Sequence, residues 1–174
     1  EDYFDKNIAL EHVLEQRGKA DLLLKIRCLP DMADFCFVRQ KEPLGLGHAV
    51  LSARAVVGEE PFALILPDDL LERKELVLMR MLEIFGEYHG SVIALKQVGR
   101  DEVQRYGVVR AKKIAEDIYQ VIDLVEKPKP SQAPSALAVM GRYVLTPEIF
   151  VELESTPPGA GGEIQLTDGL KGLL

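Results

Sequence analysis

The chain has 174 residues, a formal net charge of −7 and a hydrophobic share of 47%. This length suits one domain over residues 1–174 with a sizeable core, and the acidic balance argues against a dedicated nucleic-acid-binding surface. No apolar run approaches the roughly 18 residues that cross a membrane, and the two cysteines form no C-x-x-C pair. We therefore expect a cytoplasmic protein with free thiols at Cys28 and Cys36.

Helical and strand-like patterns alternate in the first half of the chain. Apolar residues at helical spacing predict a helix over residues 8–26 with a break at Gly18. The run DFCFVRQ, residues 34–40, predicts a strand, and a helix is expected over residues 47–57. The nearly all-apolar start of PFALILPDD, residues 61–69, predicts a strand buried on both faces.

The second half continues this alternation and adds two strands joined by a polar turn. We expect a helix over 74–88, a strand in SVIALKQV (91–98), a hairpin of YGVVRA (106–111) and YQVIDLVEKP (119–128), and a strand in LAVMGRYVL (137–145). Pro147 is a good first-turn residue for a short helix. The pattern predicts an α/β fold with a mostly parallel mixed sheet, helices on both faces and an inserted β-hairpin.

Polar residues directly follow three of the predicted strands, at Arg39–Gln40, Asp68–Asp69 and Glu126–Lys127. In open α/β sheets, ligands bind beyond the carboxyl ends of the strands. Paired carboxylates at 68–69 suit Mg²⁺, and a helix N-cap is the alternative interpretation. A lysine beside a glutamate suits a phosphate and hydroxyl groups, with a weak exposed ion pair as the alternative.

The glycine-containing loops give less specific signals. The loop with Gly45 and Gly47 matches neither common phosphate-binding pattern, and TPPGAGGEIQLTD (156–168) predicts a flexible loop with Glu163 in the first turn of a last helix. The histidines His12, His48 and His89 show no metal-ligand spacing, and packing or a local hydrogen bond is expected for His48.

Taken in order, several motifs resemble one enzyme family. These are VRQKEPLGLGHAV, LPDD, YGVV, VEKPKPSQAPSALAVMGRYVLTPEIF and TPPGAGGEIQLTD. Together they resemble the bacterial UTP–glucose-1-phosphate uridylyltransferases, or UDP-glucose pyrophosphorylases, over nearly the whole chain. The resemblance implies a Rossmann-like nucleotidyltransferase fold that joins UTP and glucose 1-phosphate into UDP-glucose, with Mg²⁺ as cofactor. It also implies a homo-oligomer, a dimer or a tetramer, in the complete protein.

The resemblance assigns the nucleotide and metal side of the site. Gln40 matches the residue that reads the uracil ring, since a carboxamide offers a donor and an acceptor side by side. Gly45 matches a position where the backbone approaches the base. Asp68 matches the catalytic Mg²⁺ ligand, and Asp69 is expected to support it or to face the sugar.

The resemblance also assigns the sugar side. Gly107 matches a backbone contact to glucose, and Glu126 matches the acceptor of glucose hydroxyl groups. Lys127 matches the lysine that holds the sugar phosphate, and it is the second residue expected to carry catalysis. The implied reaction is in-line attack by glucose 1-phosphate on the α-phosphorus of UTP, which needs no general base.

Two features of this family are not found in the sequence. A G-x-G-T-R-x-x-P-x-x-K-type loop for the UTP phosphates does not occur, and a second metal-binding aspartate is expected beyond the region that ends at Leu174. We therefore expect an incomplete nucleotidyltransferase domain that is a weak catalyst by itself. The alternatives are a related sugar-nucleotide transferase, such as a thymidylyltransferase, and a non-catalytic nucleotide-sugar-binding module.

Overall fold

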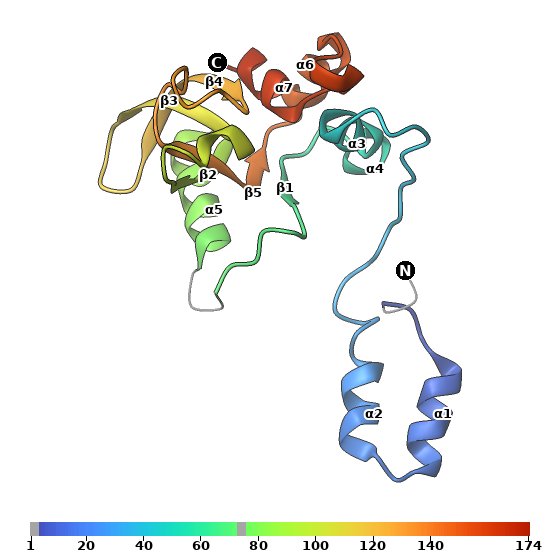
Figure 1. Ribbon diagram of the computed structural model, residues 1–174. Helices are drawn as coiled ribbons and strands as arrows, with labels where there is room; N and C mark the ends of the chain where they lie inside the picture. Colours follow the sequence, from blue (N-terminus) through green and yellow to red (C-terminus); the bar gives the residue numbers. More distant parts are fainter. Residues whose placement is uncertain (1–3, 73–75) are drawn as a thin grey trace. The chain divides into compact units, whose positions relative to one another are not determined.

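The computed structural model describes residues 4–72 and 76–174, which divide into a unit up to Arg39 and a unit from Gln40 to Leu174. The first unit contains helices α1 (Ile8–Gln16) and α2 (Ala20–Arg27) (Figure 1). The predicted break is confirmed, because Gly18 adopts a left-handed φ of 62° between the two helices.

Two kinds of side-chain contact occur within this first unit, besides the burial of Leu14 and Leu23. The Arg27 guanidinium bonds Glu11 and Glu15 of α1, each at 2.8 Å, and so links the two helices. The Phe4 ring stacks on Phe35 with centroids 4.3 Å apart. Because the ion pairs are solvent-exposed, they add little stability by themselves.

The prediction of a strand at residues 34–40 is wrong. This stretch has no regular secondary structure and takes part in none of the described strand pairings. Phe35, Phe37 and Val38 are exposed at 43%, 50% and 44%. Apolar alternation favours an extended chain, but a ladder forms only where a neighbouring strand pairs with the backbone N–H and C=O groups.

The second unit is an α/β assembly in which the described residues form a five-stranded sheet. Its strands are β1 (Phe62–Ile65), β2 (Val92–Gln97), β3 (Gly107–Lys113), β4 (Tyr119–Glu126) and β5 (Leu137–Leu145). Its helices are α3 (Leu46–Ser52), α4 (Arg54–Val57), α5 (Val77–Tyr88), α6 (Glu148–Ser155) and α7 (Leu166–Gly172), with short 3-10 turns at Val103–Arg105 and Ala160–Gly162.

The described sheet is antiparallel, which corrects the expected mostly parallel arrangement. Strand β5 pairs antiparallel with β1, β2 and β3, and β3 pairs antiparallel with β4. Tyr143 has Leu64 of β1 on one side and Ile93 of β2 on the other. Strands β1 and β2 therefore run in the same direction, as a helical crossover predicts, but β5 lies between them.

Helices cover both faces of this sheet, as expected (Figure 1). On one face, Tyr143 and Leu145 pack with residues of α3, α6 and α7. On the other, Val144 packs with Met81 of α5. Successive residues of β5 thus point to opposite faces, which explains why this strand is apolar along its length.

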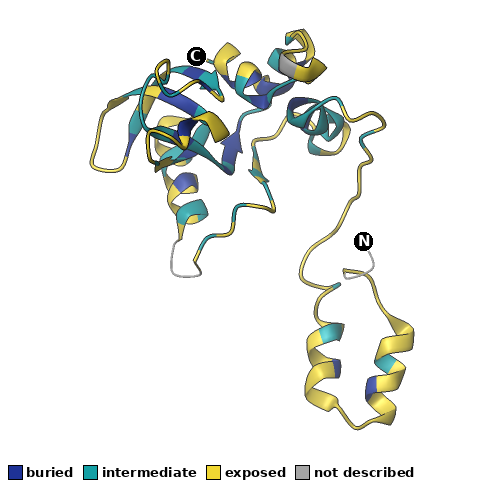
Figure 2. Cartoon of the chain, in the orientation of Figure 1, coloured by how far each residue is buried: buried dark blue, intermediate teal, exposed yellow. Residues whose placement is uncertain are grey.

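The β-hairpin is confirmed as β3 and β4, which pair from Gly107↔Glu126 to Lys113↔Tyr119. The prediction that the strand in PFALILPDD is buried on both faces is wrong. Strand β1 alternates between half-buried and exposed residues (Figure 2), and Ile65 is 50% exposed. This strand has only β5 as a neighbour in the described sheet.

No described helix has both the length and the apolar character needed to span a membrane.

Candidate functional site

The turn after β1 is fixed against the middle of β5. The Asp69 carboxylate accepts a hydrogen bond from the Gly141 N–H at 2.5 Å, and Arg142 donates to the carbonyls of Leu66 and Asp69 at 2.9 and 2.5 Å. A Cβ on Gly141 would lie 2.7 Å from Leu66 Cβ, so only glycine permits this approach. Asp69 therefore anchors the turn, and Arg142, which sequence reasoning missed, holds its carbonyls.

Asp68, in contrast, is exposed at the tip of this turn. Among the described residues, no hydrogen bond or ion pair engages its carboxylate, and no group of three or more His, Cys, Asp or Glu could hold a metal. The N-cap interpretation is not supported for α5, because that helix is capped at Leu76. One free carboxylate fits Mg²⁺, which usually keeps water and phosphate oxygens as its other ligands.

Tyr143 is a buried residue of β5 near the acidic turn and the end of β4. Burial raises the pKa of its phenol to about 12, and the negative charges of Glu126, Asp69 and Asp68 add to this shift. The phenol is therefore within electrostatic reach of all three carboxylates. Sequence analysis predicted each acid but missed the tyrosine, which looks like one more apolar position of a buried strand.

Three elements meet at Glu126. Its Oε2 accepts a hydrogen bond from Thr167 of α7 at 2.5 Å, and its Oε1 lies 3.7 Å from the Lys127 ammonium. Gly107 is its partner across the hairpin, and a Cβ there would lie 3.2 Å from Glu126 Oε2. The structure thus brings together Gly107, Glu126 and Lys127, the residues that the resemblance assigns to the sugar side.

Lys127 adopts an unusual backbone conformation directly after β4. Its φ is +43°, in the left-handed region that favours glycine, and its N–H donates to the Tyr106 carbonyl at 3.0 Å. The side chain is 61% exposed. Non-glycine residues in this region carry a strain of about 1–2 kcal/mol and are common at functional sites. The long, exposed contact to Glu126 leaves the ammonium available for a ligand.

Gln40 is held by the loop that follows it. Its amide Nε2 donates to the Gly45 carbonyl at 3.1 Å and to Nδ1 of His48 at 2.9 Å. Since the Gly45 carbonyl only accepts hydrogen bonds, the amide nitrogen must face it. Gln40 Oε1 then has no hydrogen-bond donor among the described residues. The local hydrogen bond expected for His48 is confirmed.

The same loop packs closely on the segment before α7. Gly45 has a φ of +96°, and a Cβ there would lie 2.8 Å from Glu163 Cβ. The Ile164 N–H donates to the Leu44 carbonyl at 2.7 Å, and the Gly47 N–H donates to the Ile164 carbonyl at 2.8 Å. The chain itself therefore requires glycine at position 45, whatever the position contributes to a ligand.

The expected place of Glu163 in the first turn of the last helix is wrong. Its backbone is extended, with φ −94° and ψ 142°, and α7 begins only at Leu166. The acidic residue of the first turn is Asp168. Glu163 lies instead beside Gly45, because the hydrogen bonds of Ile164 hold this stretch against the loop.

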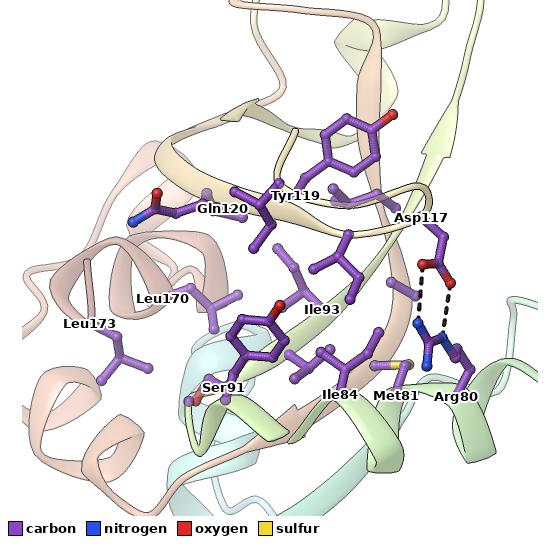
Figure 3. A pocket seen from close by; sticks show the side chains of 18 of the residues that line it. Arg80, Met81, Ile84, Ser91, Ile93, Asp117, Tyr119, Gln120, Leu170 and Leu173 are labelled. Atoms are coloured by element: carbon purple, nitrogen blue, oxygen red, sulfur yellow. Dashed lines mark hydrogen bonds and ion pairs between the residues drawn. The ribbon is translucent and has the colours of Figure 1, made fainter. Parts of the chain in front are cut away.

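A broad apolar groove lies apart from these polar residues. It is lined by residues of α5, β2, the β3–β4 hairpin and α7, and by none of the predicted site residues (Figure 3). At its rim, Arg80 forms two hydrogen bonds with Asp117 at 2.9 and 3.1 Å, and these bonds lower the pKa of the Asp117 carboxyl. The predicted site residues therefore do not belong to this groove.

Comparison with known proteins gives a consistent result. A family model described as nucleotidyl transferase matches residues 11–174. The chain is 46% identical over 172 residues to a UTP–glucose-1-phosphate uridylyltransferase of Pseudomonas aeruginosa, covering 98% of this chain and 62% of that protein. A Bacillus subtilis protein of the same name is 46% identical over 173 residues, which cover 99% and 59% of the two chains. The chain thus spans about three-fifths of these relatives.

Solved structures show the same similarity. A UDP-glucose pyrophosphorylase complexed with UDP-glucose superposes with a TM-score of 0.87 at 43% identity, covering 98% of this chain and 62% of that one. A UTP-bound UGPase from Acinetobacter baumannii gives 0.86 at 41%, covering 98% and 60%. A putative glucose-1-phosphate thymidylyltransferase from Bacillus anthracis shares the fold alone, at 24% identity with a TM-score of 0.59, covering 75% and 49%.

Proposed function

Because the chain belongs to the nucleotidyl transferase family, we propose that it carries the uracil- and glucose-binding part of a UTP–glucose-1-phosphate uridylyltransferase. The observation that supports this most is the convergence of Gly107, Glu126 and Lys127 at the end of the hairpin. The buried Tyr143 lies within electrostatic reach of Glu126 and of the Asp68–Asp69 turn. The names of the relatives support the same activity. We also propose that residues 1–174 belong to one nucleotidyltransferase domain.

Base recognition in this proposal depends on Gln40. Both amide hydrogens of this residue are engaged within the loop, so the group left for a ligand is the acceptor Oε1. Uracil presents a donor at N3–H, which this oxygen suits, whereas the N3 of cytosine is an acceptor and would be repelled. We place Gly45 at the same base, where its backbone comes near the ring.

Sugar binding in this proposal uses the end of the hairpin. Glu126 keeps acceptor capacity for glucose hydroxyl groups beyond its bond to Thr167, and the Gly107 backbone lies beside it. Lys127 holds the phosphate of glucose 1-phosphate. Asp69, whose side chain anchors the acidic turn, supports Asp68 rather than touching the sugar.

The reaction needs positioning and charge neutralisation more than proton transfer. An oxygen of glucose 1-phosphate forms a bond to the α-phosphorus of UTP, the bond from that phosphorus to the bridging oxygen breaks, and pyrophosphate leaves with the electron pair. The attacking oxygen is already anionic, so no base is required. Lys127 lowers the repulsion between the two phosphorylated reactants and orients the attacking group.

A divalent metal is part of this proposal, and Mg²⁺ is the ion we expect. Asp68 would hold it, because its exposed carboxylate is a hard oxygen ligand at the tip of an anchored turn. When bound, such an ion supplies additional positive charge at the phosphates.

We also propose a cytoplasmic location, in keeping with the free Cys28 and Cys36. A dimeric or tetrameric assembly is proposed as well, as the resemblance implies.

Two other functions compete with this proposal. A thymidylyltransferase would use the same N3–H donor, but the structural relative with that name shares only the fold. A non-catalytic nucleotide-sugar-binding module would need no metal ligand and no free lysine, yet Asp68 and Lys127 are both exposed and available. Neither alternative is favoured by an observation of its own.

Calorimetric titration tests the proposed specificity. We expect the protein to bind UDP-glucose at least about tenfold more tightly than CDP-glucose, because cytosine N3 would face Gln40 Oε1 without a proton between them. Gln40→Met, which keeps the length of the side chain but removes its polar groups, should abolish this difference. Equal affinity of the unaltered protein for the two nucleotide sugars would contradict the proposal.

A further inference from the structure

We propose that Thr167 is a positioning residue that fixes the Glu126 carboxylate for the hexose. The inference rests on the proposed function, because it assigns Glu126 to the sugar. It adds Thr167 of α7, which lies within the motif at 156–168 but was given no role in the site by the strand ends or by the resemblance. Thr167 acts through Glu126 and need not touch the substrate.

The geometry at Glu126 carries the inference. The Thr167 hydroxyl donates to Glu126 Oε2 at 2.5 Å, a short charge-assisted hydrogen bond. The other oxygen, Oε1, lies 3.7 Å from the Lys127 ammonium, and the side chain is 24% exposed. One oxygen is thus tied to the protein while the carboxylate remains accessible, so its orientation toward a ligand is set before binding.

The neighbouring glycine indicates how tightly this position is packed. A Cβ on Gly107 would lie 3.2 Å from Glu126 Oε2 and 3.3 Å from the Thr167 hydroxyl oxygen. Backbone of β3, a carboxylate of β4 and a hydroxyl of α7 therefore meet at one point. The Thr167 hydroxyl therefore holds one carboxylate oxygen beside the β3 backbone.

Helix α7 is itself held firmly against β4. Lys171, one helical turn after Thr167, forms an ion pair with Asp123 of β4 at 2.8 Å. On its inner face, α7 buries Leu166 and Leu170 in the core. Because threonine is β-branched, few χ1 rotamers are open to it in a helix. In the rotamer that Thr167 adopts, the hydroxyl reaches Glu126.

The segment before α7 connects this support with the Gln40 loop. Ile164 makes backbone hydrogen bonds to Leu44 and Gly47, and Thr167 follows three residues later. One short stretch therefore supports both the loop assigned to the base and the carboxylate assigned to the sugar. A change confined to the Thr167 hydroxyl should disturb only the sugar side, because the backbone bonds of Ile164 remain.

Thr167→Val tests this role, since valine keeps the shape and removes the hydroxyl. We expect its Kd for UDP-glucose to rise at least about tenfold while its Kd for UDP stays unchanged, as for the loss of a hydrogen bond to a charged group. Thr167→Ser should restore tight binding of UDP-glucose. Thr167→Ala provides a second variant without the hydroxyl, should a methyl group against the Glu126 carboxylate prevent folding.

Lys171→Met serves as the matched control, because it breaks the ion pair between α7 and β4 and leaves Thr167 in place. We expect it to lower the melting temperature without changing the ratio of the two Kd values. An unchanged ratio in a folded Thr167→Val or Thr167→Ala protein would overturn the positioning role alone. If the unaltered protein bound UDP-glucose no more tightly than UDP, the proposed sugar site would fail, and this inference with it.

Discussion

At the scale of single residues, the candidate site combines carboxylates and one exposed ammonium group with a buried phenol. Asp68, Glu126 and Lys127 directly follow apolar runs, so their placement at strand ends was predictable. Tyr143 and Arg142 were not, because a tyrosine or an arginine inside a strand has many possible roles. Only the observed neighbours, the carboxylates around Tyr143 and the carbonyls around Arg142, reveal what these side chains do.

Tyr143 gives a pH-dependent prediction. Its pKa is raised from the usual 10 to about 12, so the folded state retains a proton that the unfolded chain loses first. The stability linked to this group is complete below pH 10 and is lost as the pH rises toward 12, a change of about 2 to 3 kcal/mol. Denaturant unfolding from pH 9 to pH 12 should show this loss, and Tyr143→Phe should remove it.

The carboxylate contribution to the same pKa is separately measurable. Glu126→Gln removes one negative charge near the phenol, so the Tyr143 pKa should fall below its value in the unaltered protein. Ultraviolet difference titration near 295 nm follows tyrosine ionisation, and subtracting the curve of Tyr143→Phe isolates this residue. A pKa that does not move would mean that Glu126 and Tyr143 lie too far apart to interact.

Lys127 should matter for turnover and not for folding. Its ammonium is 61% exposed and 3.7 Å from its acidic partner, so Lys127→Ala should change the free energy of unfolding by less than about 0.5 kcal/mol. Loss of the phosphate contact should lower kcat/KM for glucose 1-phosphate at least about 100-fold. Lys129→Ala, at another exposed lysine two residues later, is the control and should remain active.

At the scale of elements, the positions of helices and strands were largely predictable, and their pairing was not. The periodicity over 8–26 and the glycine at position 18 gave two helices as expected. The alternation of strands and helices correctly implied that β1 and β2 run in the same direction. Strand β5 pairs with both of them and so lies between them. This pairing joins residues far apart in the sequence, and the local pattern of apolar residues does not predict it.

The contact between α3 and the segment before α7 gives a prediction at this scale. A Cβ on Gly47 would lie 2.8 Å from the Ile164 carbonyl oxygen, so Gly47→Ala should destabilise the fold by about 1–3 kcal/mol. Gly86→Ala in α5 is the matched control, since a Cβ there has no neighbour within 4 Å. Alanine should stabilise that helix by up to about 1 kcal/mol, and chemical denaturation measures both changes. Equal effects of the two substitutions would contradict the packing described here.

At the scale of the whole molecule, the resemblance to a known family predicted more of the function than the residue patterns did. Ordered motifs across the chain predicted the similarity that the comparisons confirm, with 46% identity to named uridylyltransferases. Strand-end chemistry alone pointed only to a phosphate and metal site. The difference arises because Gln40 and Gly107 have no distinctive chemistry until their neighbours are known: His48 and Gly45 orient the amide, and Glu126 lies beside the glycine.

The most direct test of the proposed function is pyrophosphate release with Mg²⁺, glucose 1-phosphate and each nucleoside triphosphate in turn. The 174-residue chain and the polypeptide encoded by its complete reading frame should be assayed side by side. The proposal predicts that the polypeptide of the complete frame releases pyrophosphate with UTP, that release requires glucose 1-phosphate, and that Lys127→Ala suppresses it. Faster release with another nucleoside triphosphate, or release from UTP without glucose 1-phosphate, would contradict it.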